Sequence, residues 1–315
     1  MPAKSLAHQQ VQTAMDHAAA RAKAATGGKN ANYIPYLANI DSSLFGLSVC
    51  LVDGTCLSLG DAARPFGVES ISKVFTAALI LKQLGPETVR QKIGADATGL
   101  PFNSIMAIIL ENHSPSTPLV NAGAISACSL VEPTGNSDAK WAAILQNFED
   151  LCGSPVALID ELYRSESATN FDNRSIAWLL RDYGRIYDDV DLSLDLYTRQ
   201  CSLAVTAEQL AHAAATIANG GVSPTGGKEV LSADLARKLT SLICTVGFYQ
   251  STGDWLYRTG IPAKSGVGGG ILAVVPGVMG IGAFAPPLDA AGNSVRGQEA
   301  VAALGEELGL NVFQG

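Results

Sequence analysis

The stretch from Ser70 to Leu84 constrains the fold most, because it predicts a helix that is apolar on every face. Its sequence is SISKVFTAALILKQL, and a helix this hydrophobic all round has no side to turn toward water. Other elements of the protein must therefore cover it. With 315 residues, of which 47% are hydrophobic and 16% charged, the chain is long and apolar enough to build a large core around this helix.

The segments on either side of this helix predict strands that come from opposite ends of the chain. Before it, the stretch LFGLSVCLVDGTCLSLGD has two β-leaning runs around Asp53-Gly54, a strong signal for a hairpin. After about residue 250, the stretch SGVGGGILAVVPGVMGIGAFAPPLD predicts two or three strands broken by glycine and proline. Neither group makes a stable sheet alone, so we expect them to pair in one sheet.

The middle of the chain, from about residue 85 to 250, predicts mainly helices. The stretches AKWAAILQNFEDLCG and NRSIAWLLRDYG each end at glycine, a common helix stop. The stretch TAEQLAHAAATIANGG begins with Thr206 and Gln209 at the spacing of a capping box. The tail GQEAVAALGEELGL predicts a last amphipathic helix.

These patterns predict an α/β (α+β) fold in one catalytic unit over residues 1–315. We expect an α/β sheet subdomain from residues 1–75 and 230–315, approximately. A helical subdomain of approximately residues 76–229 would be inserted between those two segments.

The charge balance and the apolar runs restrict the partners. A net charge of −8 argues against nucleic acid or an anionic membrane. No segment reaches the ~18 to 20 uninterrupted apolar residues of a membrane span. The N-terminus lacks the apolar region of a secretory signal, and with Asp16 and few arginines it favours a surface helix over a transit peptide. We expect a cytoplasmic protein.

The cysteines and histidines show no spacing typical of a metal site or a disulfide framework. No C-x-x-C pair occurs, so free thiols in a reducing compartment are the simplest interpretation. The closest cysteine and histidine are Cys201 and His212, which is no metal-ligand spacing. The cysteines are Cys50, Cys56, Cys128, Cys152, Cys201 and Cys244.

The serine and lysine at the start of the apolar helix can form a nucleophile and its base. Residues three apart share a helix face, so Ser70 and Lys73 project together. A desolvated lysine can take the serine's proton, and N–H groups at the helix N-terminus can stabilise the oxyanion that follows. The alternative is ordinary: a serine there is often a cap, and a lysine is usually solvated.

A second motif, Lys264-Ser265-Gly266, begins a predicted strand in PAKSGVGGG. A hairpin, then S-x-x-K, then K-T/S-G on an edge strand is the order in serine β-lactamases and penicillin-binding proteins. Alone, the second motif is weak, and a glycine-rich turn would also explain it. The three glycines indicate that some group approaches this backbone closely or that the strand bends there.

Together these stretches resemble the serine-dependent glutaminase family, which has a β-lactamase/transpeptidase-like fold: a mainly antiparallel sheet flanked by helices, with a mostly helical inserted subdomain. Members hydrolyse the side-chain amide of L-glutamine to L-glutamate and ammonia, and need no metal or organic cofactor. They are usually homo-oligomers, so a dimer or tetramer is expected. The matching stretches run in family order: NYIPYLA, ESISKVF, LVNAGAI, SESATNFDNRSIA, LDLYTRQCS, GFYQSTG, GIPAKSGVGGGI and GNSVRG.

The resemblance implies a role for each matching residue. Ser70 would be the nucleophile, Lys73 its activating partner and Tyr249 a second proton-transfer group, able to shuttle a proton if Lys73 lowers its pKa. The backbone of Val267 would complete the oxyanion hole with the Ser70 N–H. The glutamine pocket would be lined by Asn121, Glu166, Asn173 and Tyr197, with Tyr33 at its mouth.

The residue types suit these roles without the family, although each has an ordinary alternative. Glu166 can pair with the substrate's ammonium group, while asparagine and tyrosine donors can hold its carboxylate. Equally, Tyr249 would fit a hydrophobic core, Asn121 a helix cap, and Glu166 the protein surface. Which of Lys73 and Tyr249 takes the first proton stays open.

The chain departs from the family pattern at two points. Many members have glutamine where this chain has Glu69, and a carboxylate there would shift the pKa of a neighbouring lysine or tyrosine. Many also have arginine before the pocket asparagine, whereas here the order is Asp172-Asn173-Arg174, and Asn173 is aligned by its spacing from Glu166. With no ankyrin repeats or long N-terminal extension in view, we expect a catalytic core of the bacterial type.

Two other functions remain possible for the same fold. A β-lactam-hydrolysing or penicillin-binding enzyme would usually carry a secretion signal, which is absent from the sequence as given. A non-catalytic binding protein would have less need of Ser70, Lys73 and Tyr249 together.

Overall fold

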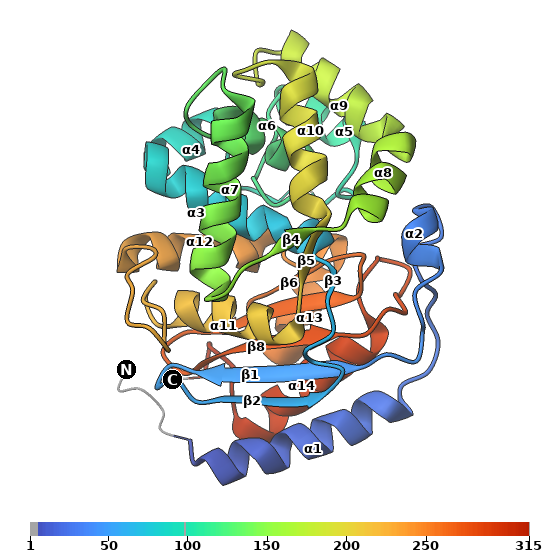
Figure 1. The fold of residues 1–315 in the computed structure, drawn as a ribbon, viewed down its shortest axis with the longest axis vertical. Helices are drawn as coiled ribbons and strands as arrows, with labels where there is room; N and C mark the ends of the chain where they lie inside the picture. Colours follow the sequence, from blue (N-terminus) through green and yellow to red (C-terminus); the bar gives the residue numbers. More distant parts are fainter. Residues whose placement is uncertain (1–5, 98, 315) are drawn as a thin grey trace.

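The structure is a computed structural model that describes residues 6–97 and 99–314. Its main sheet is antiparallel and has the strand order β2-β1-β8-β7-β6 (Figure 1). The N-terminal hairpin therefore pairs with the C-terminal strands through β1 and β8, which confirms the expected joint sheet. The strands are β1 (Gly46–Leu51), β2 (Cys56–Gly60), β6 (Ala263–Ser265), β7 (Gly270–Val275) and β8 (Met279–Phe284).

Helices cover both faces of this sheet. On one face lie α1 (His8–Ala24) and α14 (Val295–Leu308), which pack along each other at the bottom of the view (Figure 1). On the other face α11 (Ala207–Ala218) lies directly on β8, although its sequence falls in the segment expected to be helical subdomain. A Cβ atom at Gly282 would come within 2.0 Å of the Ala207 carbonyl oxygen, so glycine is required for this contact.

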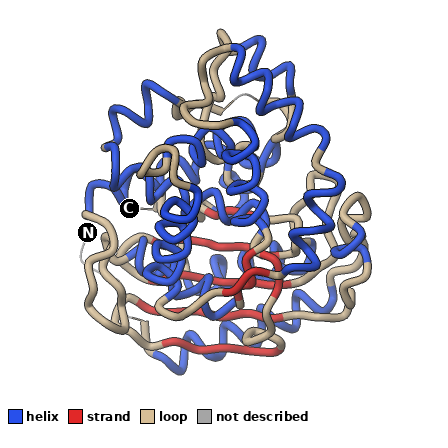
Figure 2. Tube along the Cα trace, turned by 45° about the horizontal axis from the view of Figure 1, so that its top comes forward, coloured by secondary structure: helices blue, strands red, loops and turns tan. Residues whose placement is uncertain are grey.

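Most of the remaining helices form a second body above the sheet, whereas α13 packs against α14 beside the sheet (Figures 1 and 2). At its centre is α3 (Ser72–Leu84), buried from Ser72 through Leu81 and packed against α6, α7 and α12. Other helices thus cover the apolar helix that begins at the S-x-x-K motif, as its sequence predicts. The other helices are α2 (Pro35–Ala38), α4 (Pro86–Lys92), α5 (Ile105–Leu110), α6 (Asn121–Leu130), α7 (Ser137–Cys152), α8 (Asp160–Thr169), α9 (Phe171–Asp182), α10 (Val190–Cys201), α12 (Ala233–Val246) and α13 (Thr252–Thr259).

A small second sheet joins the two bodies, and the sequence patterns did not predict it. Its strand order is β3-β5-β4, with β3 (Phe66–Gly67), β4 (Ala157–Leu158) and β5 (Leu203–Val205). Strands of two or three residues are too short to show an alternating pattern. The Val68 N–H extends this pairing by donating to the Leu203 carbonyl oxygen at 2.9 Å, directly before the S-x-x-K motif.

The expectation that all cysteines are free is wrong for one pair. Cys50 and Cys56 form a disulfide across the β1–β2 hairpin, where they face each other in register. Both lie three residues from Asp53, so their placement on either side of the Asp53-Gly54 turn indicates a cross-strand pair, which C-x-x-C spacing does not detect. The free thiols are Cys128, Cys152, Cys201 and Cys244.

The helices show the predicted ends and no membrane span. The capping box of Thr206 and Gln209 is present, and α7 ends at Gly153 in a left-handed conformation. Within residues 6–97 and 99–314, every helix is too short or too polar to cross a bilayer.

Candidate active site

The predicted nucleophile and base are in contact at the entry to α3. Ser70 lies in a 3₁₀ turn, Glu69–Ile71, that leads into the helix, and Lys73 lies in the first helical turn. The Lys73 Nζ donates to Ser70 Oγ at 2.5 Å. Lys73 is fully buried, so the ordinary interpretation of a solvated lysine is wrong.

Burial prepares this amine to act as a base. Desolvation lowers the pKa of Lys73, although the nearby Cys201, Glu69 and Glu166 partly oppose that effect. A lowered pKa increases the fraction of neutral amine at a given pH, and only the neutral amine can accept the proton of Ser70.

Tyr249 lies on the other side of Ser70. It begins the 3₁₀ turn Tyr249–Ser251 and has a φ of 54°, a left-handed conformation that is unusual for a tyrosine. Its hydroxyl is hydrogen-bonded to Ser70 and donates to the Ser265 carbonyl oxygen at 3.4 Å. Non-glycine residues held in such conformations are concentrated at functional sites.

The pKa of Tyr249 is raised, whereas a proton shuttle through its phenolate would need a lowered pKa. Burial raises this pKa, and the hydrogen bond with Ser70 only partly offsets the effect. Tyr249 therefore keeps its proton at neutral pH and is suited to donate rather than accept. The condition that Lys73 lowers the Tyr249 pKa is not met.

A second buried lysine supports this tyrosine. Lys264, on β6, is fully buried, and its Nζ lies 4.1 Å from the centre of the Tyr249 ring. It donates to the carbonyl oxygens of Gly247 at 3.2 Å and Ser265 at 2.7 Å. Desolvation and the nearby Lys73 lower its pKa well below the usual lysine value. The K-S-G motif thus places an amine and an edge strand beside the nucleophile.

The glycine run after this motif lets two backbone segments touch. A Cβ atom at Gly268 would lie 2.3 Å from the Gly67 carbonyl oxygen, and one at Gly266 would lie 2.8 Å from that of Val68. This close approach brings Val267 beside the turn that carries Ser70. The expectation that some group approaches this backbone closely is confirmed.

Replacing Gly268 with alanine should therefore lower the free energy of unfolding by about 1 to 3 kcal/mol, the cost of forcing extra volume into a packed site. The matched control is Gly253→Ala, because a Cβ atom there would meet nothing within 4 Å. Urea denaturation of both variants gives the comparison. Equal stability of the two variants would show that the segments separate without cost.

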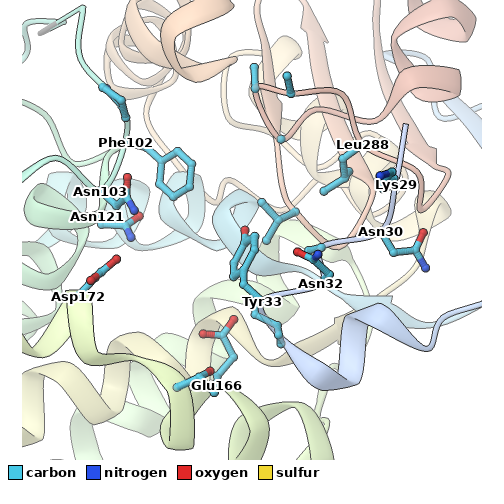
Figure 3. Close-up of a pocket in the computed structure, with 18 of the residues that line it drawn as sticks. Lys29, Asn30, Asn32, Tyr33, Phe102, Asn103, Asn121, Glu166, Asp172 and Leu288 are labelled. Atoms are coloured by element: carbon cyan, nitrogen blue, oxygen red, sulfur yellow. The ribbon is translucent and has the colours of Figure 1, made fainter. Parts of the chain in front are cut away.

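A cavity of about 980 Å³ lies beside these residues (Figure 3). The carboxylate of Glu166, from α8, points into the space near Tyr33, and Asn121 lies across it with Asp172 (Figure 3). Asn121 donates to Asn173 Oδ1 at 2.9 Å, so the aligned asparagine does belong to this pocket wall. Predicted residues among those lining the cavity are Tyr33, Asn121, Glu166, Asn173 and Val267.

Tyr197 lies deeper than a pocket wall. It is 4% exposed and is not among the residues that line the cavity. Its ring centre lies 5.4 Å from Lys73 Nζ. Burial raises its pKa well above the usual tyrosine value. Its position next to Lys73 makes it a neighbour of the base as much as of the substrate pocket.

One polar atom in the pocket is buried without a partner among the described residues: Asn121 Oδ1. An unpaired acceptor costs free energy in the empty site and becomes satisfied when a ligand donates to it.

The structure adds residues that the motifs did not indicate. Phe102 lines the cavity, and its ring centre is 4.5 Å from that of Tyr249. Asn293 is fully buried, accepts from Ser265 Oγ at 2.5 Å and donates to Ser251 Oγ at 3.0 Å. It thereby ties the edge strand to the Tyr249 turn. Asn293 lies in the matching stretch GNSVRG, so a signal for it was present.

The sequence of this chain is similar to those of known glutaminases along nearly its whole length. The family described as Glutaminase matches residues 28–313. A glutaminase of Bacteroides fragilis is 62% identical over 312 residues, which is 99% of this chain and 97% of that protein. A glutaminase of Parabacteroides distasonis is 64% identical over 293 residues, covering 93% and 91%.

Solved structures show the same fold. A structure described as probable glutaminase ybaS has a TM-score of 0.96 and 50% identity, covering 98% of this chain and 100% of that one. A structure of Mglu in its glutamate form has a TM-score of 0.92 and 34% identity, covering 98% and 70%. The fold is thus the β-lactamase-like one expected. The chain belongs to the glutaminase family, whose members hydrolyse the side-chain amide of L-glutamine to L-glutamate and ammonia.

Proposed function

We propose that this glutaminase works through a covalent glutamyl ester on Ser70. The observation that carries the proposal is the contact of 2.5 Å between Lys73 Nζ and Ser70 Oγ, made by a lysine without access to water. A hydroxyl becomes a nucleophile when a positioned base takes its proton, and this amine has the required position and lowered pKa.

In the first half of the reaction, Lys73 accepts the Ser70 proton and Ser70 Oγ attacks the side-chain amide carbon of glutamine. The N–H groups of Ser70 and Val267 hold the resulting oxyanion. Tyr249 then gives its proton to the amide nitrogen, which leaves as ammonia. The Tyr249 phenolate takes a proton back from the Lys73 ammonium group, so both side chains return to their starting protonation states. Because burial raises the Tyr249 pKa, Lys73 rather than Tyr249 takes the first proton.

In the second half, water attacks the glutamyl ester. The same groups assist: one proton leaves the water toward Lys73, the oxyanion forms again between the Ser70 and Val267 N–H groups, and Ser70 recovers a proton as glutamate is released. The starting protonation states of Ser70, Lys73 and Tyr249 are restored, and water is the only co-reactant consumed.

The pocket residues recognise the α-carbon end of glutamine. Glu166 pairs with the ammonium group, and the side-chain N–H groups of Asn121 and Asn173 bind the carboxylate end. Tyr33, 57% exposed, lies at the mouth of the cavity. The relative Mglu, which was solved in a glutamate form, supports glutamate as a ligand of this site.

Glu166→Gln should weaken glutamine binding by about 1 to 3 kcal/mol, the range of a charge-assisted hydrogen bond. The matched control is Glu161→Gln, an exposed residue of the same helix. Steady-state measurement of KM for glutamine gives the comparison. An unchanged KM in the Glu166 variant would remove this residue from the ammonium subsite.

The rival activity of the same fold is β-lactam hydrolysis, and the comparisons do not favour it, because the matched family and relatives are glutaminases. Two assays on the purified protein test the proposal. One measures ammonia release from glutamine and from asparagine, and the other measures hydrolysis of nitrocefin. Ammonia from glutamine without nitrocefin hydrolysis is expected. Nitrocefin hydrolysis without ammonia release would overturn it.

We further propose that the enzyme acts in the cytoplasm as a homo-oligomer of two or four chains. The four free thiols support a reducing compartment, although the Cys50–Cys56 disulfide counts against one. Exposed apolar side chains on α5, among them Met106 and Leu110, support association. Sedimentation velocity gives the number of chains, and a monomer at micromolar concentration would refute the oligomer.

A further inference from the structure

Glu69, the residue before the nucleophile, is a carboxyl group held inside the protein. It is 3% exposed and has a φ of 50°, in the left-handed region. Its side chain runs against the glycine turn: Cβ atoms at Gly266 and Gly268 would lie 3.4 Å and 3.3 Å from its Cβ and Cγ atoms. Because the side chain is buried, the carboxyl group must find its partner inside the site.

That partner is another carboxyl group. The carboxyl groups of Glu69 and Glu166 are hydrogen-bonded to each other, and Glu69 Oε1 is buried without a hydrogen-bond partner among the described residues. A carboxylate has no hydrogen to donate, so one member of the pair must carry a proton. Burial raises the pKa of both groups. Glu166 lines the cavity, whereas Glu69 is 3% exposed and does not, so the proton belongs on the more deeply placed Glu69.

The other groups around Glu69 do not remove this proton. Lys73 lowers the pKa of Glu69, yet its own charge is disfavoured by burial, and Cys201 acts in the opposite direction. The glycine turn contributes no titratable side chain. The remaining titratable groups that interact with Glu69 are the phenols of Tyr33, Tyr197 and Tyr249. A phenol is neutral at neutral pH, and burial raises the pKa of Tyr197 and Tyr249 further.

We propose that Glu69 is a positioning residue that works as a neutral acid: its O–H group donates to the Glu166 carboxylate and fixes it for the ammonium group of the substrate. This inference rests on the proposed role of Glu166 in the ammonium subsite. The proton also keeps a single negative charge beside the nucleophile. A second charge, one residue from Ser70, would oppose the developing oxyanion and keep Lys73 protonated.

Two variants separate the hydrogen bond from the charge. Glu69→Gln has an amide donor that never ionises, and Glu69→Leu has similar volume and no donor. We expect Glu69→Leu to raise KM for glutamine about 10- to 100-fold, the loss of a hydrogen bond to a charged group, and Glu69→Gln to recover most of that loss. Equal KM values for the two variants would overturn the proposal.

The pH profile of kcat provides the second readout. In the native enzyme kcat should fall on the alkaline side as Glu69 loses its proton, and in Glu69→Gln this fall should be absent or begin at higher pH. Comparing the two enzymes at each pH cancels the titration of the substrate's own ammonium group. An identical alkaline fall in both enzymes would contradict a role for the Glu69 proton.

Infrared spectroscopy tests the shared proton without turnover. The native minus Glu69→Gln difference spectrum at pH 7 should contain the C=O stretch of a protonated carboxylic acid. Absence of this band would overturn the inference while leaving the glutaminase mechanism intact. Conversely, failure of the protein to release ammonia from glutamine would remove the proposed function, whereas the band would persist.

Discussion

Replacing Ser70 with alanine is expected to lower the rate of ammonia release from L-glutamine by at least about 10⁴-fold, because the reaction loses its covalent route. The fold should survive, since the Ser70 side chain takes part only in its hydrogen bonds with Lys73 and Tyr249. That loss leaves a buried amine unpaired and costs about 1 to 3 kcal/mol of stability. Ammonia assays and circular dichroism on the same preparation measure both effects.

The matched control for this variant is Ser72→Ala. Ser72 is also buried at the start of α3, but its hydroxyl lies 3.5 Å from Cys201 Sγ rather than next to Lys73. We expect this variant to retain activity within roughly one order of magnitude, the scale of one ordinary hydrogen bond. If both serine variants lost activity equally, the loss would reflect damage to the helix entry.

Replacing Lys73 with methionine is expected to lower kcat by about 10² to 10⁴-fold with a much smaller change in KM, because a base acts in the transition state. In the native enzyme kcat should fall as the pH drops through the lowered Lys73 pKa, since protonation removes the base. The methionine variant should lack this acid-side fall. A variant that changes only KM would contradict the role of Lys73 as base.

The same substitution should increase stability near neutral pH. Because the folded protein lowers the pKa of Lys73, the unfolded chain binds more protons, and folding is penalised at every pH below the ordinary lysine value. The penalty is largest below the folded pKa and disappears as the pH rises toward the unfolded one. Urea unfolding of the methionine variant should therefore show a higher free energy at pH 7 and a weaker pH dependence. Lower stability would mean that the amine is not disfavoured where it lies.

The sequence predicted the parts of this site that depend on local spacing. Ser70 and Lys73 are three residues apart at the start of an apolar helix, so their contact follows from helix geometry. The Asp53-Gly54 hairpin and the glycine run after Lys264 also follow from local backbone preferences. Tyr33, Asn173 and Val267 came from resemblance to a family, because nothing local distinguishes them from ordinary surface or core residues.

Features that depend on distant contacts could not be predicted. Whether α11 packs on the sheet depends on Gly282, far along the chain, and the strands of the small sheet are too short to show a pattern. The direction of the Tyr249 pKa shift depends on burial, which periodicity does not give. The contact of Glu69 with Glu166 likewise joins two segments that meet only in the folded protein.

The most direct test of a covalent Ser70 intermediate is mass spectrometry of the enzyme after rapid acid quenching with L-glutamine. We predict that the peptide containing Ser70 gains the mass of one glutamyl group, that this adduct is absent in Ser70→Ala, and that added hydroxylamine converts it to the glutamyl hydroxamate. A glutamyl adduct on any other residue would contradict the account, as would steady ammonia release with neither an adduct nor a hydroxamate.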